Sequence, residues 1–313
     1  MPQGSVLGPL LFCLYINDLK DFPGIAWALR LLYADDLQIY IQVLATKPEI
    51  ERGIQQLSEL ARIVADWAKL NHLTLNAKKT KAIVFGTAQT IKLFKELQRP
   101  SITINNAGDQ TEFVNEITSL GVILDSTLSW DAQVNRVTKK VNKALYGLRF
   151  IKPCTTQTLR KRLVESLVMP HLDYCSVVYH DASLTLRKRL QRLSNEGIRY
   201  IFGLRRDTHI TPFRRQLGWM RGDTRREYFA LLTLYRIVRI REPPILLPLF
   251  TEFQPERPTR GVRKDLETGS APPNTFQTKF AKMWNSTPTE LRDQPSYSRF
   301  KRGIKQYLTN LDF

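Results

Sequence analysis

Two adjacent carboxylates, Asp35 and Asp36, are the residues of this chain best placed to do chemistry. They separate two apolar runs, residues 25–33 and 37–44, which are rich in β-branched and aromatic side chains. Such runs around a short polar break predict a β-hairpin with the acidic pair at its tip. Mg²⁺ binds proteins through one or two carboxylates together with substrate phosphates, so the tip could serve phosphoryl transfer. Asp is also common in ordinary turns, and the pair alone leaves that interpretation open.

Four stretches of the chain, taken in order, strengthen the chemical interpretation. They are PQGSVLGP at residues 2–9, LLYADDLQIY at 31–40, LNAKKTK at 75–81 and SLGVILD at 119–125. In this order and spacing they resemble palm motifs B, C, D and E of reverse transcriptases from non-LTR retrotransposons, jockey-like insect elements most of all. A lone Ala-Asp-Asp is a weak signal, whereas four motifs in order are a strong one.

The resemblance implies an RNA-directed DNA polymerase and assigns catalytic roles. In this family the primer 3′-hydroxyl attacks the α-phosphate of a deoxynucleotide, assisted by two Mg²⁺ ions. Asp35, the principal metal ligand, and Asp36 would hold these ions. Lys79, with Lys78 as the alternative, would protonate the leaving pyrophosphate. Without the resemblance, lysines in a connecting turn are most often a solvated edge.

The same resemblance assigns binding roles to residues around the acidic pair. Gln3, Gly4 and Tyr33 would contact the templating base and the incoming nucleotide, although Gly4 alone would be read as a tight turn. Leu120 and Gly121 would form the primer grip, where a residue without a side chain lets the primer backbone come close. The implied partners are an RNA template, a DNA primer and dNTPs.

The third metal-binding aspartate of the family lies in motif A, upstream of the Pro-Gln-Gly loop at which this sequence begins. We therefore expect a piece of a polymerase that is inactive alone and poorly soluble, because sheet edges and core would be exposed. The missing N-terminal part of the polymerase is a possible partner that would restore activity. A further alternative is a non-catalytic nucleic-acid-binding remnant of a retrotransposon.

Charge is distributed unevenly along the 313 residues. Residues 1–125 carry 12 Lys and Arg against 13 Asp and Glu, and residues 126–313 carry 35 against 16. A strongly basic half points to nucleic acid or an anionic membrane surface, although a solvated basic surface is the plain alternative.

The three cysteines, Cys13, Cys154 and Cys175, are too scattered for a disulfide framework or a zinc site. No run reads as a signal peptide or a transmembrane segment. We expect an intracellular protein, and the resemblance implies the nucleus.

Apolar periodicity predicts the elements of the first 129 residues. We expect a buried helix from Pro9 to Ile16 and a long amphipathic helix over residues 49–70. Short strands are expected at 73–75 and 82–85, around the lysine turn. Residues 101–104 are expected to pair with an arm over 113–125 that carries the primer grip.

From residue 130 the pattern becomes helical and basic. An apolar stripe from Val134 to Leu148 follows helical spacing, and the cations Arg136, Lys139, Lys140 and Lys143 lie outside it. Further helical spacing spans residues 156–169, 183–203 and 213–240. These helices predict a thumb that holds a template–primer duplex by its phosphates.

The sequence therefore predicts an α+β fold in three parts. Residues 1–129 would form the C-terminal part of a polymerase palm, an antiparallel sheet with packed helices. Residues 130–242 would form the all-α thumb. Residues 243–313 would form a Pro-rich linker and a helical C-terminal tail with Trp284 and Phe300 docked.

Overall fold

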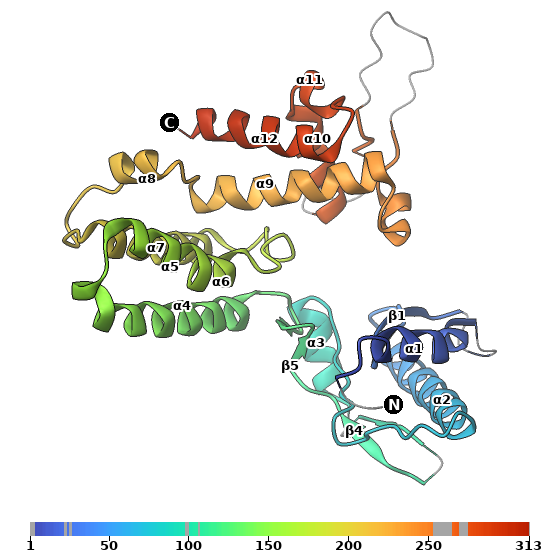
Figure 1. The fold of residues 1–313 in the computed structure, drawn as a ribbon. Coiled ribbons are helices and arrows are strands. Elements are labelled where there is room, and N and C mark those ends of the chain that lie inside the picture. The colour runs from blue at the N-terminus through green and yellow to red at the C-terminus, as the bar shows by residue number, and fades with distance from the viewer. Residues whose placement is uncertain are drawn as a thin grey trace, which may run out of the picture. The chain divides into compact units, whose positions relative to one another are not determined.

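The computed structural model describes residues 4–21, 24, 27–97, 100–105, 107–252, 265–268 and 275–312. The chain divides into two compact units, an N-terminal unit of residues 1–129 and a helical unit of residues 130–313 (Figure 1). Short antiparallel strands occur in the first unit and helices in both, which confirms the predicted α+β class.

The N-terminal unit combines helices with three two-stranded antiparallel sheets in its described part. Its elements, in chain order, are α1 (Gly8–Tyr15), η1 (Asn17–Asp21), β1 (Leu29–Tyr33), β2 (Asp36–Tyr40), α2 (Lys47–Leu70), α3 (Ala88–Lys95), β3 (Ser101–Thr103), β4 (Gln110–Glu112), β5 (Glu116–Ser119) and β6 (Val122–Asp125).

Helix α2 carries the core of the N-terminal unit. Thr46 is extended at its N-cap, and a proline and Glu49 in its first turn suit a helix start. Its apolar face buries Leu60, Val64 and Trp67 almost completely. Apolar side chains of β2 pack on the same cluster. The predicted helix over 49–70 is confirmed, beginning two residues earlier.

Two predictions around α2 are wrong. No strand forms at 73–75 or 82–85; only Ala82 makes an isolated bridge, to Phe113. Leu73 and Leu75 still pack against the α2 cluster, so their apolar character reflects packing rather than strand pairing. Helix α3, with Thr87 as its N-cap, was not predicted from the sequence.

Helix α1 forms at the predicted place but is not buried. No residue of α1 is buried, and Leu10 and Leu14 are 59% and 64% exposed. An all-round apolar helix normally lies in a core. Here the described residues do not cover it, so its apolar side chains reach solvent.

The region after residue 100 folds as two hairpins rather than the one predicted. Strand β3 pairs with β4, Ser101 opposite Glu112. Strand β5 pairs with β6, Ser119 opposite Val122, so Leu120 and Gly121 form a two-residue loop. A polar stretch near Gly108 turns the chain early, which frees residues 116–125 to pair with themselves.

The helical unit consists of helices throughout its described part. They are α4 (Asp131–Ile151), η2 (Lys152–Cys154), α5 (Gln157–Leu167), α6 (Met169–Asp173), α7 (Leu184–Phe202), α8 (Thr211–Leu217), α9 (Gly222–Tyr235), η3 (Arg236–Ile240), η4 (Pro244–Leu249), α10 (Phe276–Ser286), α11 (Thr289–Arg292) and α12 (Tyr297–Leu311).

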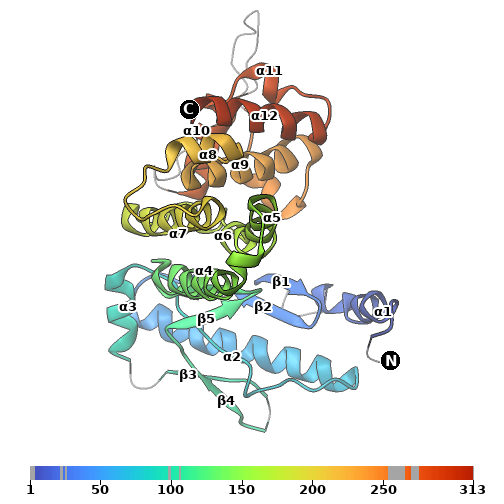
Figure 2. The ribbon, with the colours of Figure 1, turned by 60° about the vertical axis from the view of Figure 1, so that its left-hand side comes forward.

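These helices stack in layers: α5, α6 and α7 lie between α4 and α9, and α10 and α12 lie on the other side of α9 (Figures 1 and 2). The predicted helix over 156–169 forms as α5, and the short helix α6 follows it. The predicted helix over 213–240 is interrupted at Gly218, whose φ of +64° ends α8. A residue in the left-handed region is the common end of a helix.

The last helices share one core with α9. Leu231 and Leu234 pack with the buried side chains of Trp284, Phe300 and Ile304. Residues on both sides of the expected thumb–tail boundary at 242 thus contribute to a single cluster. The three-part division itself stays a proposal.

Candidate active site and nucleic-acid surface

Asp35 and Asp36 lie at the tip of a tight hairpin. Strand β1 pairs with β2 so that Tyr33 stands opposite Asp36, which leaves Ala34 and Asp35 as the two-residue loop. Ala34 has φ of +50°, as the first loop position of such a turn requires. Both carboxylates are exposed, and Asp36 is the first residue of β2. The predicted hairpin is confirmed.

The hairpin has one face toward the core and one away from it. Leu37, Ile39 and Ile41 pack against the α2 cluster. Because side chains alternate along a strand, Asp36, Gln38 and Tyr40 occupy the opposite face. Their cross-strand partners on that face are Tyr33, Leu31 and Leu29. The register therefore directs the Asp36 carboxylate away from the core.

A hydrogen bond connects this face of the hairpin to the strand that precedes the predicted primer grip, Leu120–Gly121. Gln38 Nε2 donates to Ser119 Oγ at 2.7 Å, and Tyr40 donates its hydroxyl to Gln38 Oε1 at 2.5 Å. Burial raises the pKa of Tyr40, which keeps the phenol protonated as a donor. Ser119 directly precedes the Leu120–Gly121 loop, so the bond holds that loop beside β2.

The Leu120–Gly121 loop has left-handed backbone at both positions, with φ of +44° and +80°. This is the geometry of a type I′ hairpin turn, which glycine adopts readily and leucine does not. The leucine side chain is 43% exposed. The loop therefore presents backbone and one apolar side chain next to the acidic hairpin.

The turn that carries Lys78 and Lys79 is separate from the acidic hairpin. Lys78 and Lys79 are exposed, and the Lys79 amide donates to Asn76 Oδ1 at 3.1 Å. Thr111 Oγ1 donates to the Thr80 carbonyl at 2.8 Å and fastens the turn to β4. Among the described residues no ion pair joins either ammonium group to Asp35 or Asp36.

Two of the three residues predicted to bind nucleotide and template are described by the structure, and both are exposed. Tyr33 is 66% exposed at the end of β1, next to the acidic tip. Gly4 is exposed with φ of +88° and open space where a Cβ would stand. Gln3 lies outside the described residues.

The acidic tip suits a divalent cation only in part. Two exposed adjacent carboxylates supply oxygen ligands of the kind Mg²⁺ takes alongside water and phosphate oxygens. No group of three or more His, Cys, Asp or Glu side chains close enough to hold a metal exists in the described chain. The pair therefore fits a metal that also has ligands from a substrate or another carboxylate.

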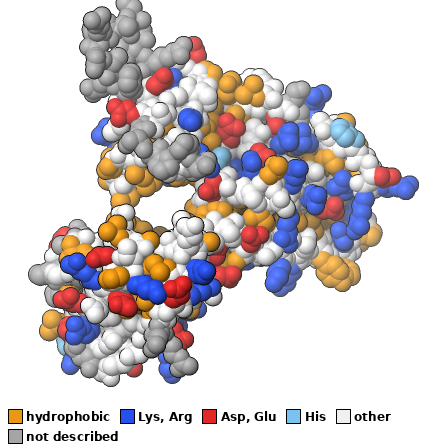
Figure 3. Space-filling view, turned by 180° about the vertical axis from the view of Figure 1, so that it is seen from behind, with side chains coloured by type: hydrophobic (Ala, Val, Ile, Leu, Met, Phe, Trp, Pro, Cys, Tyr) orange, Lys and Arg blue, Asp and Glu red, His pale blue; other side chains and the backbone are white. Residues whose placement is uncertain are grey.

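The four predicted duplex-binding cations lie on α4 in the helical unit. The stripe Val134, Val137, Val141, Leu145 and Leu148 is buried. Lys139, Lys140 and Lys143 are exposed, whereas Arg136 is half-buried. Lysine and arginine side chains are spread over the face of the helical unit seen in Figure 3. Exposed ammonium groups of this kind bind phosphates without reading sequence.

The exposed side of α4 also carries two aromatic rings. Tyr146 and Phe150 are 62% and 68% exposed, and their ring centroids lie 4.9 Å apart. With Lys139 and Lys143 they follow a spacing of four, three and four residues, which places them along one side of the helix. The sequence analysis named the cations and missed this pair.

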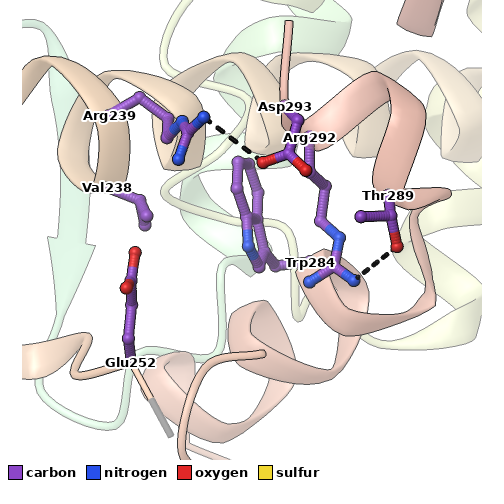
Figure 4. A pocket seen from close by; sticks show the side chains of 7 residues that line it. All are labelled: Val238, Arg239, Glu252, Trp284, Thr289, Arg292 and Asp293. Carbon is purple, nitrogen blue, oxygen red and sulfur yellow. Dashed lines mark hydrogen bonds and ion pairs between the residues drawn. The ribbon is translucent and has the colours of Figure 1, made fainter. Parts of the chain in front are cut away.

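A small cavity of the helical unit is too small to be a substrate site. It measures about 10 Å³ and is lined by the residues drawn in Figure 4. Around the Trp284 ring, Arg239 pairs with Asp293 at 3.3 Å and Arg292 bonds Thr289 at 3.4 Å (Figure 4). Such a volume accommodates about one water molecule. The cavity is therefore a packing feature.

Among the described residues, none of the helices combines the length and apolar character that crossing a bilayer requires. Separately from this finding, α4 has charged residues along its length, and its apolar stripe is buried.

Comparison with known proteins finds a family model and several similar polymerases. Residues 1–124 match the family model described as reverse transcriptase (RNA-dependent DNA polymerase). The chain is 26% identical over 211 residues to the RNA-directed DNA polymerase from mobile element jockey of Drosophila funebris, covering 65% of this chain and 22% of that protein. It is 29% identical over 209 residues to the probable RNA-directed DNA polymerase from transposon BS of Drosophila melanogaster, covering 64% and 22%.

A third relative is matched over more of its own length. The Retrovirus-related Pol polyprotein from type-1 retrotransposable element R1 of Nasonia vitripennis is 26% identical over 236 residues, covering 71% of this chain and 65% of that protein. The chain spans about a fifth of the length of the jockey and BS proteins. No solved structure matches it.

Proposed function

We propose, from the premise that residues 1–124 belong to the reverse transcriptase family, that this chain serves in an RNA-directed DNA polymerase of a non-LTR retrotransposon. The observation that carries the proposal is the Gln38–Ser119 hydrogen bond. It holds the Leu120–Gly121 loop beside the strand that begins with Asp36. An acidic tip and a primer-grip loop must be neighbours in such an enzyme, because both act on the primer end.

The reaction is nucleotidyl transfer. The primer 3′-hydroxyl forms a new bond to the α-phosphorus of a dNTP as the bond to pyrophosphate breaks. Bound Mg²⁺ would activate the attacking hydroxyl and stabilise charge on the leaving oxygen, and Asp35 and Asp36 are the residues that would hold it. The Leu120–Gly121 loop would support the primer backbone.

Further roles follow the family pattern. Lys79, with Lys78 as the alternative, would give a proton to the leaving pyrophosphate. Tyr33 and Gly4 would contact the incoming nucleotide and the templating base, together with Gln3. The family works with divalent metal ions and with a nucleic-acid template and primer; Mg²⁺, an RNA template and a nuclear place of action are our proposals.

Asp35 and Asp36 alone do not make a two-metal centre, since such centres need more oxygen ligands than two adjacent carboxylates supply. We therefore expect the 313-residue chain to be inactive by itself. A polymerase segment that carries a third carboxylate, joined to it or added in trans, should restore activity.

The test is primer extension in a chimera. Residues 1–124 replace the matching segment of the jockey polymerase, and the chimera is given a primed RNA template, dNTPs and Mg²⁺. We expect extension, and we expect Asp35→Asn to lower its rate about a hundredfold or more, because several kcal/mol of charge stabilisation are lost. The exposed strand residue Glu112 supplies a matched control: Glu112→Gln removes one carboxylate and should leave the rate unchanged.

Two results would contradict separate parts of the proposal. Template-directed extension by the 313-residue chain alone would contradict its expected inactivity and show that its own two carboxylates suffice. Extension by the Asp35→Asn chimera at the unsubstituted rate would remove the metal-holding role.

A second candidate is a non-catalytic nucleic-acid-binding protein. The exposed lysines of α4 favour it, because they need no metal to bind phosphates. Under this alternative the chain binds duplex with an affinity that falls steeply with salt, and Asp35→Asn has no effect in either the chain or the chimera.

A further inference from the structure

A groove within the helical unit is not used by the proposed polymerase site. It has a volume of about 710 Å³ and lies between α5, α6, α9 and α12, with the loop from Leu217 to Met220 at one end. Ligand pockets of proteins commonly fall between about 300 and 1,000 Å³. The groove is therefore large enough for a nucleotide-sized group.

Helix α12 forms one wall with two cations and one ring. Phe300, Ile304 and Leu308 face the core, so the neighbouring row of Tyr297 and two lysines, Lys301 and Lys305, is free to line the groove. Both lysines are exposed, and within the described chain neither ammonium group forms an ion pair. This wall offers two positive charges to an incoming anion.

Helix α9 forms the facing wall. Arg225, Phe229 and Leu232 follow helical spacing along it, and Arg236 lines the groove from the start of η3. The Arg225 guanidinium lies 5.4 Å from the centroid of the Phe229 ring. A half-buried ring with a cation above it is a surface on which a flat, electron-rich base can stack.

The two carboxylates in the groove are already engaged. Asp173 accepts two hydrogen bonds from Arg225, at 2.6 and 2.5 Å. Glu165 accepts from Trp219 Nε1 at 3.3 Å and lies 3.9 Å from Lys161. Their charges are therefore partly neutralised by groups of the protein. The positive charge that an incoming ligand meets comes mainly from the lysines of α12.

Ser176 supplies an independent sign of a ligand. It lines the groove, is 1% exposed, and its hydroxyl has no hydrogen-bond partner in the described chain. A buried hydroxyl without a partner costs about 1–3 kcal/mol. Such a cost is offset when a bound molecule supplies the missing donor or acceptor.

We propose that this groove binds an unpaired nucleotide of a single-stranded nucleic acid, with the base between Phe229 and Tyr297 and the phosphates on Lys301 and Lys305. The inference rests on the proposed function in one respect: a polymerase that copies RNA must hold single strand as well as duplex. The groove is matched to a single strand because its rings can stack only on a base that is not paired within a duplex.

The test measures the binding of a fluorescent 12-nucleotide RNA to the full chain by anisotropy, over a range of salt concentrations. In Lys301→Gln/Lys305→Gln we expect about tenfold weaker binding at low salt. The slope of log K against log salt should fall by about 1.4, since each phosphate contact on a single strand contributes about 0.7. Arg299→Gln/Arg302→Gln removes two charges from the same helix outside the groove and should change affinity less than about twofold.

Two single substitutions separate binding from folding. Ser176→Ala should weaken RNA binding while leaving the melting temperature unchanged or higher, because an unsatisfied buried hydroxyl is removed. Phe229→Leu keeps an apolar side chain and removes the ring, so it should weaken single-strand binding about tenfold with duplex binding retained.

The outcomes distinguish this inference from the proposed function. The groove proposal would be overturned if the two double variants lost the same amount of RNA affinity. It would also be overturned if the groove variants lost the same affinity for duplex as for single strand. Equally effective competition by poly-glutamate of the same charge would also overturn it, since an acidic peptide carries no base. If the groove variants act as predicted while Asp35→Asn leaves the chimera active, the groove stands and the polymerase proposal fails.

Discussion

At position 121 the backbone conformation, rather than a side-chain contact, is the reason that glycine is favoured. Its φ of +80° lies in the left-handed region, where an L side chain is strained by about 1–2 kcal/mol. Leu120 already occupies a left-handed position in the same loop, so the hairpin tolerates one strained residue. A second strained residue in this loop would destabilise a sheet that has only two short strands.

We therefore predict that Gly121→Ala lowers the free energy of unfolding of the N-terminal unit by about 1 kcal/mol. Denaturant titration followed by circular dichroism checks this. Gly8→Ala is the matched control, because its added methyl meets Ser5 at an ordinary 3.6 Å in a right-handed helix. Equal effects of the two substitutions would mean that the loop conformation is not what Gly121 provides.

At the scale of elements, the association of two hairpins determines whether the two halves of the candidate site lie together. Strands β1 and β2 form one sheet and β5 and β6 another, with no ladder between them among the described residues. Side-chain contacts must therefore position the Leu120–Gly121 loop. Gln38 and Ser119 supply the hydrogen bond, at 2.7 Å, and Tyr40 orients the Gln38 amide.

A double-mutant cycle tests this link. Gln38→Leu and Ser119→Ala should each destabilise the N-terminal unit by about 1 kcal/mol, and the double variant should cost less than the sum by about 0.5–1.5 kcal/mol. The free energies of unfolding of the four proteins give the coupling. Strict additivity would show that the two side chains do not interact in solution.

Elements also show where sequence patterns were sufficient. The alternation around Asp35–Asp36 and the three-and-four spacing of residues 49–70 and 134–148 are local, and β1–β2, α2 and α4 form there. The pairing of β3 with β4 was missed, because the choice between two partner strands depends on which turn closes first. The pattern at 73–75 was misread, because packing on α2 and strand pairing both call for apolar residues.

At the scale of the whole molecule, the helical unit carries the excess of positive charge and two histidines whose pKa values are lowered. Burial, reinforced by the charge of Lys140, lowers the pKa of His171 in the helical unit. Burial lowers the pKa of His180 as well, with Arg226 and Arg187 as further causes. Both side chains therefore bind a proton less readily in the folded chain than in the unfolded chain.

Through these two histidines acid should weaken the helical unit, whereas Glu227, whose pKa is raised by burial and by Asp312, acts in the opposite direction. The pKa values of the two histidines in the folded chain lie below the value of about 6.5 for unfolded histidine, so protons bind the unfolded chain better. The contribution to stability is complete above about pH 6.5 and declines as the pH falls through the folded pKa values. Each histidine adds at most about 1.4 kcal/mol per pH unit to the slope.

Denaturant unfolding at pH 7.5 and at pH 5.5, followed by circular dichroism, measures this decline. In His180→Gln the loss of stability between the two pH values should be smaller than in the unsubstituted chain. A variant with an unchanged loss would place the acid sensitivity elsewhere.

The sequence by itself determined the acidic hairpin, the long amphipathic helices, the basic second half and the resemblance that identified the polymerase family. All of these follow from short-range pattern, since a turn and an amphipathic face are each written within a few consecutive residues. The tertiary structure alone decided that the Leu120–Gly121 loop is held by Gln38, that α1 stays exposed, and that α5, α9 and α12 enclose a groove around Ser176. These depend on contacts between residues tens of positions apart, and no local pattern specifies which distant surfaces will meet.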